Sequence, residues 1–286
     1  MRKIYFNKEN IEIDEGVLFG RGAFETILVK NKPIFFSNHI KRLNNAIEVL
    51  SIGEKIDENE LLDEIKKYEI KNKALKILVT PKNIVIIERD INYKDEDYKK
   101  GFKLKLSKVI RNSTSILTYV KSTNYIENLM ENQRAKKEGY NEVIFLNEQG
   151  FVTECSTANI FMVKSGVIYT PKLECGLLNG ILRDFVINNF SVIEKEITLE
   201  ELLESDEIFI TNSLLGIMKV TLIFDNRYVN CNSDKKSIKH KNNSYDNRNS
   251  ENDTGNRYYE KHNITNEIIS KYREYVKESG GKKHDG

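Results

Sequence analysis

The sequence has no tryptophan, and it contains only three prolines, three cysteines and four histidines among 286 residues. The cysteines, Cys155, Cys175 and Cys231, are an odd number at wide spacing, which suits neither a disulfide framework nor a tetrahedral metal site. His39 lies on a predicted helix and the other histidines lie in the C-terminal tail, which leaves no His-x-x-x-His pair and no Ser-His-Asp set. We therefore expect reduced thiols, no metal site and no serine hydrolase.

The sequence also lacks a charge imbalance and a long apolar run. Its 45 basic and 43 acidic residues give a formal net charge of +2, so the composition indicates neither a nucleic-acid partner nor a membrane surface. No apolar run approaches the roughly twenty residues that span a bilayer, and the N-terminus lacks the apolar region of a signal peptide. We expect a cytoplasmic protein that acts on a small molecule.

Short β-rich runs alternate with amphipathic helices over most of the chain, which predicts an α+β protein. Residues 1–112 are expected to form a small α+β domain and residues 113–229 a larger, strand-rich domain, with the polar segment 111–115 as the linker. Residues 230–263 are rich in Asn, Lys, Ser and Asp and poor in aliphatic residues, which favours a disordered, solvated insertion over an RNA-binding tail. Residues 264–286 begin with apolar positions at helical spacing, so we expect a final helix and a tail.

Local patterns in the first domain predict its elements. Strands are expected over Lys3–Ile13 and Phe24–Phe36, and Ser37 is the expected N-cap of the helix that follows. Asp57 is placed to cap a second helix. The segment Ala74–Arg89 predicts a hairpin.

The second domain is predicted to be a sheet or partial barrel. A helix over Asn124–Lys137 precedes four short strands between Glu142 and Thr170, and Thr198 with Glu201 forms a capping pattern for a short helix. This order is not that of a doubly wound dinucleotide-binding fold. The Gly-x-Gly at Gly20 has no third glycine and precedes a predicted strand, so a turn explains it.

Lys121 and Glu154 are the most informative pair of charged residues. Lys121 ends an apolar segment before small polar residues and a helix, where a partly dry amine could lose its proton and attack a carbonyl. Glu154 begins the run Glu-Cys-Ser-Thr-Ala-Asn before another strand. A reactive lysine with an acidic partner is the minimal protein contribution to pyridoxal phosphate chemistry. Taken alone, however, each residue is more often a solvated surface charge.

Two segments offer donors to a phosphate group. Cys175–Arg183 is a glycine-containing loop that leads into a helix, whose free amides attract anions. Ile210–Leu214 supplies hydroxyl and amide donors at the end of an apolar strand. Both compositions also occur in ordinary turns.

The order of these motifs resembles the class IV aminotransferase family, the fold-type IV pyridoxal-phosphate enzymes that include branched-chain aminotransferases, D-amino acid aminotransferases and aminodeoxychorismate lyases. The resemblance spans roughly residues 19–220, with a weaker echo in the last helix. The motifs that carry it are Phe19-Gly-Arg-Gly-Ala-Phe-Glu-Thr26, His39-Ile-Lys-Arg-Leu43, Lys121-Ser-Thr-Asn-Tyr125, Val152-Thr-Glu-Cys155, Gly180-Ile-Leu-Arg183 and Thr211-Asn-Ser213.

The resemblance implies a two-domain homodimer that binds pyridoxal 5'-phosphate, with a small α+β N-terminal domain and a strand-rich pseudo-barrel. The roles it implies are Lys121 as the catalytic Schiff-base lysine, Glu154 on the pyridine nitrogen, Arg42, the amides of Ile181 and Leu182 and the hydroxyl of Ser213 on the phosphate, and Tyr125 on the phenolic oxygen.

Within the family, the chain is most similar to the aminodeoxychorismate lyases. Phe24-Glu-Thr26 and Asn179-Gly180 resemble that group, and Leu182 replaces a threonine usual in aminotransferases. The turn Thr80-Pro-Lys-Asn83 is a departure, because such proteins often carry a glycine- and arginine-rich loop there. Thr26 and Asn212 are the substrate-binding candidates by the same likeness. The alternative is a branched-chain or D-amino acid aminotransferase, which would use the same lysine and cofactor.

Overall fold

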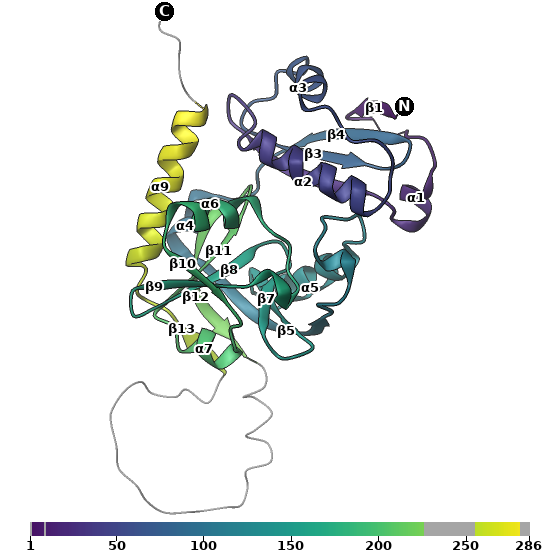
Figure 1. The fold of residues 1–286 in the computed structure, drawn as a ribbon. Coiled ribbons are helices and arrows are strands. Elements are labelled where there is room, and N and C mark those ends of the chain that lie inside the picture. The colour runs from purple at the N-terminus through teal and green to yellow at the C-terminus, as the bar shows by residue number, and fades with distance from the viewer. Residues whose placement is uncertain (1, 9, 226–254, 281–286) are drawn as a thin grey trace, which may run out of the picture.

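The computed structural model describes residues 2–8, 10–225 and 255–280, which form two sheets with flanking helices (Figure 1). Residues 226–254, which include most of the insertion expected over 230–263, lie outside the described residues. None of the described helices is long and apolar enough to cross a membrane.

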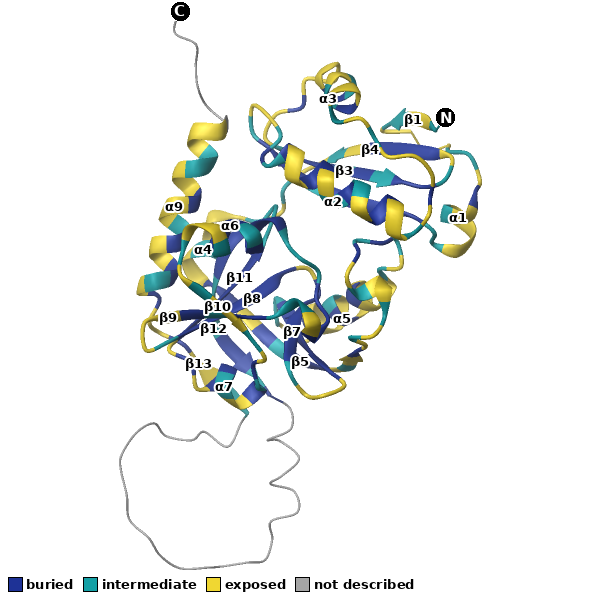
Figure 2. Ribbon diagram, viewed as in Figure 1, coloured by how far each residue is buried: buried dark blue, intermediate teal, exposed yellow. Residues whose placement is uncertain are grey.

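The smaller sheet has four strands in the order β1-β4-β3-β2 and is covered on one face by helix α2. Apolar residues recur along α2 at helical spacing and are buried, while the opposite side of the helix is exposed (Figure 2). Every second residue of β2 and β3 packs against this buried side. The elements are β1 (Lys3–Phe6), α1 (Glu15–Phe19), β2 (Ala23–Val29), α2 (Phe36–Val49), α3 (Glu58–Lys66), β3 (Lys73–Val79) and β4 (Asn83–Arg89).

The larger sheet is curled and has the order β10-β9-β8-β11-β12-β5-β6-β7, with β13 beside β12. It is mixed, since β5 runs parallel to β6 and β12, and β9 runs parallel to β10. Its strands are β5 (Phe102–Arg111), β6 (Glu142–Asn147), β7 (Val152–Cys155), β8 (Asn159–Lys164), β9 (Val167–Pro171), β10 (Val192–Lys195), β11 (Glu207–Asn212), β12 (Gly216–Phe224) and β13 (Asn256–Tyr258). The helices are α4 (Asp95–Lys100), η1 (Ile116–Thr118), α5 (Ile126–Lys137), η2 (Leu173–Cys175), α6 (Ile181–Asn189), α7 (Leu199–Leu203) and α9 (Asn263–Gly280). The expected α+β fold with a strand-rich half-barrel is confirmed.

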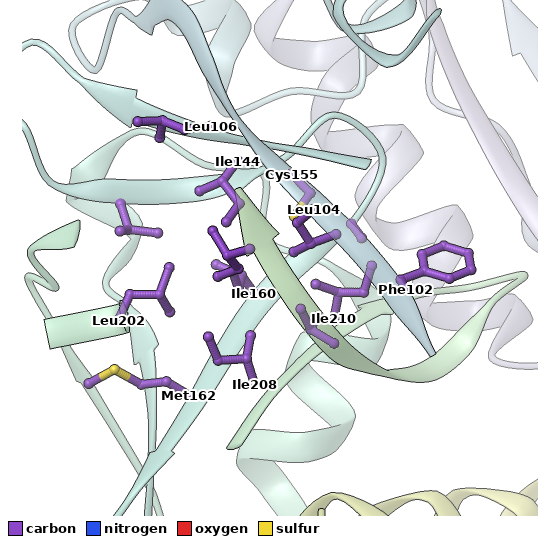
Figure 3. Close-up of a cluster of buried hydrophobic side chains, with 14 of the residues drawn as sticks. Phe102, Leu104, Leu106, Ile144, Cys155, Ile160, Met162, Leu202, Ile208 and Ile210 are labelled. Carbon is purple, nitrogen blue, oxygen red and sulfur yellow. The ribbon is translucent and has the colours of Figure 1, made fainter. Parts of the chain in front are cut away.

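The core of the larger sheet is an aliphatic cluster that includes Ile144, Ile160, Ile208 and Ile210 (Figure 3). Cys155 also lies in this cluster as a buried free thiol. Because side chains alternate along a strand, burying Cys155 in the core turns Glu154 to the other face. Core packing therefore sets the direction of the candidate acid.

Several local expectations are confirmed and others are wrong. The hairpin forms as β3 and β4, and the Asp57 side chain accepts a hydrogen bond from the backbone of Glu60. The first two strands are shorter than expected, because they end at Phe6 and Val29. Ser37 does not cap α2: Phe35 occupies that position with φ 55°. The left-handed residue turns the chain into the helix, and the Ser37 hydroxyl binds Glu58 instead.

The expected linker at residues 111–115 begins inside a strand. Arg111 is the last residue of β5 and is buried, and β5 belongs to the larger sheet. The chain therefore passes from one sheet to the other between Arg89 and Phe102, not at residue 112. Part of the expected disordered stretch is also ordered, since Asn256–Tyr258 pair with β12 as β13.

The final helix docks on the larger sheet as expected. The buried carboxylate of Glu207 on β11 accepts hydrogen bonds from the backbone amides of Ile264 and Thr265 at 3.1 and 2.9 Å. These amides are in the first turn of α9, where backbone N–H groups have no partner within the helix, so Glu207 supplies the missing acceptor. Ile268 and Tyr272 then bury one side of α9.

Candidate active site

Lys121 lies where the two sheets meet. Its carbonyl accepts a hydrogen bond from Phe24 of β2 at 2.9 Å, so the segment after η1 is tied to the smaller sheet. The Lys121 ammonium lies 4.5 Å from the centre of the Phe24 ring and 5.3 Å from that of Tyr125. Burial, followed by the charge of Arg42, lowers the pKa of Lys121 to about 8. A substantial fraction of this amine is therefore neutral near physiological pH.

Glu154 is buried on β7 with one oxygen better bound than the other. Oε2 accepts from the backbone amide of Leu178 at 3.2 Å and from Nδ2 of Asn159 at 3.3 Å. Oε1 lies 3.9 Å from Nη2 of Arg111. Burial raises the pKa of Glu154 to about 7, although Arg111, the Leu178 amide and Lys121 oppose the shift. A cation placed against this carboxyl would favour its ionised form.

Arg111 is a site residue that the sequence reasoning missed, because its polar neighbours indicated a linker. Its guanidinium lies 4.1 Å from the centre of the Phe145 ring and donates to Glu127 and Asn128, each at 3.1 Å. Nε and Nη2 are buried without a hydrogen bond. Arg111, at the end of β5, thus places a positive charge close to the Glu154 carboxylate.

Arg42 is held by a fully buried carboxylate. Its Nε and Nη2 donate to the two oxygens of Glu25 at 2.7 and 2.8 Å, and Nδ1 of His39 lies 2.6 Å from Glu25 Oε2. Burial alone would raise the pKa of Glu25, but the Arg42 charge and His39 outweigh it and hold the pKa well below its usual range. Burial lowers the pKa of His39, which favours the neutral form of its ring. The anion is Glu25 and the fixed cation is Arg42.

Arg42 also joins the smaller sheet to the start of α6. Its Nη1 donates to the carbonyl of Asn179 at 2.8 Å, which leaves two of the five guanidinium hydrogens unused. Gly180 is the N-cap of α6 and brings no side-chain acceptor, so the amides of Ile181 and Leu182 lack intrahelical partners. Arg42 and the N-terminus of α6 together form a candidate anion-binding site.

The end of β11 lies beside this helix terminus. Thr211 pairs in register with Asn159, and the Asn159 side chain donates to the carbonyl of Leu178 at 2.8 Å. The hydroxyl of Thr211 is buried without a partner. Ser213 follows two residues later, in the turn between β11 and β12. The sequence reasoning named Thr211 only as part of the Thr211-Asn-Ser213 motif, and its buried, unpaired hydroxyl adds it to the candidate site.

The other candidates occupy different surroundings. Tyr125 stands edge-on to Phe24 and donates its hydroxyl hydrogen to the carbonyl of Ser156 at 2.6 Å. Thr26 is half-buried on β2. The side-chain oxygen of Asn212 accepts from the amides of Leu214 and Leu215, so it holds its own turn. The structure thus groups Lys121, Glu154, Arg42 and the α6 terminus, and the Tyr125 ring lies beside Lys121. Among the described residues, no cluster of side chains is suited to hold a metal ion.

A family model described as "Amino-transferase class IV" matches residues 22–223. The chain belongs to this family. Aminodeoxychorismate lyase of Bacillus subtilis strain 168 is 31% identical to it over 242 residues, which cover 75% of this chain and 82% of that protein.

Two solved structures share the fold of this class IV aminotransferase family member. A proposed 4-amino-4-deoxychorismate lyase from Legionella pneumophila has a TM-score of 0.75 at 24% identity, covering 95% of this chain and 99% of that chain. The branched-chain aminotransferase of the archaeon Thermoproteus uzoniensis, solved with norvaline, has a TM-score of 0.72 at 23% identity, covering 92% and 90%. Lyase and aminotransferase names therefore both occur among the relatives.

In this class IV aminotransferase family member, a substitution at Gly180 tests whether Arg42 and the N-terminus of α6 form an anion-binding site. A Cβ at this position would lie 1.9 Å from Oδ1 of Asn159, although the backbone, with φ −78° and ψ 141°, allows alanine. We expect Gly180→Ala to displace Asn159 and to weaken pyridoxal phosphate binding about tenfold, since each charge-assisted hydrogen bond contributes about 1.4 kcal/mol or more. Absorbance titration of the apoprotein measures the affinity. Asn188→Ala, at the exposed far end of α6, is the matched control, and equal affinities for both variants would contradict the assignment.

Proposed function

We propose that this protein is a pyridoxal phosphate-dependent 4-amino-4-deoxychorismate lyase. The observation that supports the cofactor is the convergence of a partly buried lysine with a lowered pKa, a buried acid with a raised pKa, and a fixed arginine beside a helix N-terminus. These three environments match the aldehyde, the pyridine nitrogen and the phosphate of one molecule. The family relationship supports the same cofactor.

The residues would hold the cofactor by ordinary electrostatics. Lys121 would bind its aldehyde, Glu154 its ring nitrogen, and Arg42 with the amides of Ile181 and Leu182 its phosphate. Thr211 and Ser213 would add hydroxyl donors to the phosphate. Glu25 would act as a positioning residue, because it fixes the plane of the Arg42 guanidinium. Tyr125 would approach the phenolic oxygen from the Phe24 side.

Pyridoxal phosphate, when bound, supplies a ring that accepts negative charge from the substrate carbon. Lys121 would take the proton from the substrate ring carbon that bears the nitrogen. The electron pair of that C–H bond enters the substrate ring while the C–O bond to the enolpyruvyl group breaks. The ring becomes aromatic, and the departing enolpyruvate gains a proton to become pyruvate. Lys121 can do this because its lowered pKa leaves the amine free to act as a base.

The lyase assignment has its own support. The 31% identical relative is named aminodeoxychorismate lyase, and the Phe24-Glu25-Thr26 run of the sequence is present on β2 with Thr26 half-buried beside Phe24. An aminotransferase would use the same lysine to move a proton, but it would release a keto acid and pass the amino group to a second substrate. The cofactor site is common to both activities, so the substrate decides between them.

The test is a direct assay of the purified protein with added pyridoxal phosphate. We expect 4-aminobenzoate and pyruvate to form in equal amounts from 4-amino-4-deoxychorismate. The comparison reactions use branched-chain L-amino acids or D-alanine with 2-oxoglutarate. Transamination without 4-aminobenzoate would replace the lyase proposal with the aminotransferase alternative, and absence of both activities would reject the two together.

A further inference from the structure

Helices α2 and α6 carry the two halves of the candidate anion-binding site. Arg42 lies near the middle of α2, and the free amides of Ile181 and Leu182 lie at the N-terminus of α6. Helix α2 packs on the smaller sheet and α6 on the larger one (Figure 1). A phosphate group bound by both halves would bridge two separately packed units. Its affinity therefore depends on what holds the two helices at a fixed distance and angle.

The hydrogen bond between Arg42 and Asn179 joins the two helices at one point. Nη1 of Arg42 donates to the carbonyl of Asn179 at 2.8 Å, one residue before the N-cap of α6. Glu25 fixes the same guanidinium on the side of the smaller sheet. A single hydrogen bond sets a distance, but it lets the two helices pivot about the contact. A second contact between them is needed to fix the angle.

An aromatic contact supplies this second point. Phe35 is the N-cap of α2, and its ring centre lies 5.8 Å from that of Phe185, which is one turn inside α6. Tyr275 of α9 stacks on Phe35, with the ring centres 4.6 Å apart and an interplanar angle of 8°, and its ring centre lies 5.4 Å from that of Phe185. Ring pairs at such distances attract one another in preferred orientations. We call these three residues the aromatic clamp.

Phe35 is the member of the aromatic clamp that comes from the smaller unit. The rest of its apolar cluster, including Phe185 and Tyr275, comes from the larger sheet and the helices on it. Phe35 also has a φ of 55°, a left-handed conformation that is unfavourable for a bulky residue and that glycine adopts readily. A residue keeps such a conformation where its surroundings hold it in place. At this position the left-handed turn goes together with a ring that contacts both α6 and α9.

The larger unit holds its side of the aromatic clamp firmly. Glu207 ties the first turn of α9 to β11 through two backbone amides. The buried side chain of Tyr272 stands edge-on to Phe185, with the ring centres 5.6 Å apart. Tyr275 lies about one turn further along the same helix. The ring that stacks on Phe35 is therefore carried by a helix that is anchored to the larger sheet at its start and along its buried side.

We propose that the aromatic clamp positions Arg42 against the N-terminus of α6 and so sets the affinity of this site for the cofactor's phosphate group. This inference rests on the proposed function, because it concerns how that cofactor is held. Phe35, Phe185 and Tyr275 are positioning residues, since they act through Arg42 and the amides of α6. Without the clamp the two halves of the site can pivot apart, and a phosphate then contacts one half fully and the other only in part.

The experiment measures cofactor binding, not turnover. Absorbance titration of the apoprotein would compare pyridoxal phosphate with pyridoxal, which has the same ring and aldehyde but no phosphate. We expect Tyr275→Ala to weaken pyridoxal phosphate binding about tenfold, the scale of one lost charge-assisted contact, and to leave pyridoxal binding unchanged. Tyr275→Phe keeps the ring and should bind both ligands as the parent does. Tyr258→Ala, which removes an exposed tyrosine from β13, is the matched control and should also match the parent.

A second variant removes the clamp from the other side. Phe35→Gly deletes the ring, and glycine adopts the left-handed turn without strain, so this variant should fold. We expect it to show the same loss of about tenfold for pyridoxal phosphate alone. Circular dichroism and denaturant unfolding of each apoprotein show whether the variant is folded.

The outcomes separate the clamp from the proposed function. The clamp would be overturned by parent affinity for pyridoxal phosphate in folded Tyr275→Ala and Phe35→Gly, by equal losses for the two ligands, or by a loss in Tyr275→Phe as large as in Tyr275→Ala. A phosphate-specific loss in the variants of a parent that forms no 4-aminobenzoate would retain the clamp and reject the lyase activity. A parent that does not bind pyridoxal phosphate would reject the cofactor and the clamp together.

Discussion

Replacing Lys121 with alanine is expected to lower 4-aminobenzoate formation by about 10³-fold or more, because the variant loses both the nucleophile and the base. The local structure should persist, since the backbone contact of residue 121 with Phe24 does not involve the side chain. Rates under saturating substrate measure the effect.

Three observations test the role of Lys121 beyond the loss of rate. Borohydride reduction and peptide mass mapping of the parent should place a phosphopyridoxyl mass on Lys121. Lys121→Arg keeps the charge but not the reactive amine, so it should be as inactive as the alanine variant. A phosphopyridoxyl mass on another lysine would reject the assignment, whereas partial recovery of Lys121→Ala with added small amines would support it.

Replacing Glu154 with glutamine is expected to lower the rate by about 10²-fold, the scale of losing one electrostatic contact at a reacting centre. Glutamine keeps the size of the side chain but cannot carry the negative charge that a ring cation needs. Glu154→Asp is the matched comparison, because it keeps the charge and shortens its reach. A glutamine variant with the parent rate would show that this carboxylate does not serve the chemistry.

The same substitution has an opposite effect on the apoprotein. The pKa of Glu154 is raised from 4.5 to about 7 in the folded state, so the folded protein binds more protons than the unfolded chain between those values. Stability therefore falls as the pH rises through that window. Glutamine has no such loss, and we expect Glu154→Gln apoprotein to be more stable than the parent by on the order of 2 kcal/mol at pH 8, with little difference near pH 4. Denaturant unfolding at the two pH values measures it. If the free energy of unfolding changed with pH equally in the parent and in Glu154→Gln, the raised pKa of the buried Glu154 carboxyl would be contradicted.

Local pattern predicted the elements whose signals are complete within a few residues. The β3–β4 hairpin, the Asp57 cap and the capping box at Thr198 are examples, because each depends on neighbours two to three positions away in the sequence or on one turn. Ser37 shows where such reasoning ends. Its position suggested a cap, but the chain enters α2 through Phe35, whose ring stacks on Tyr275 of α9 at 4.6 Å. The contact with α9, which is distant in the sequence, therefore contributes to the environment of Phe35 and could not be read from the local pattern.

The same division holds at the site. Lys121, Glu154, Arg42 and the Gly180 loop could be found in the sequence because they lie in short, ordered motifs. Arg111 could not, since a polar segment after a strand has the composition of a linker, and its burial against Phe145 depends on the larger sheet.

By itself, the sequence determined the family, the order of the elements and the residue types available for pyridoxal phosphate, because these are properties of local pattern and motif order. Only the tertiary structure decided that the pKa of Lys121 is lowered, that Glu154 carries a raised pKa, and that Glu25 holds Arg42. The physical reason is that desolvation and charge pairing act through space. Their strength depends on which distant segments exclude water from a group, and residues such as Arg42 and Asn179 become neighbours only when both sheets have formed.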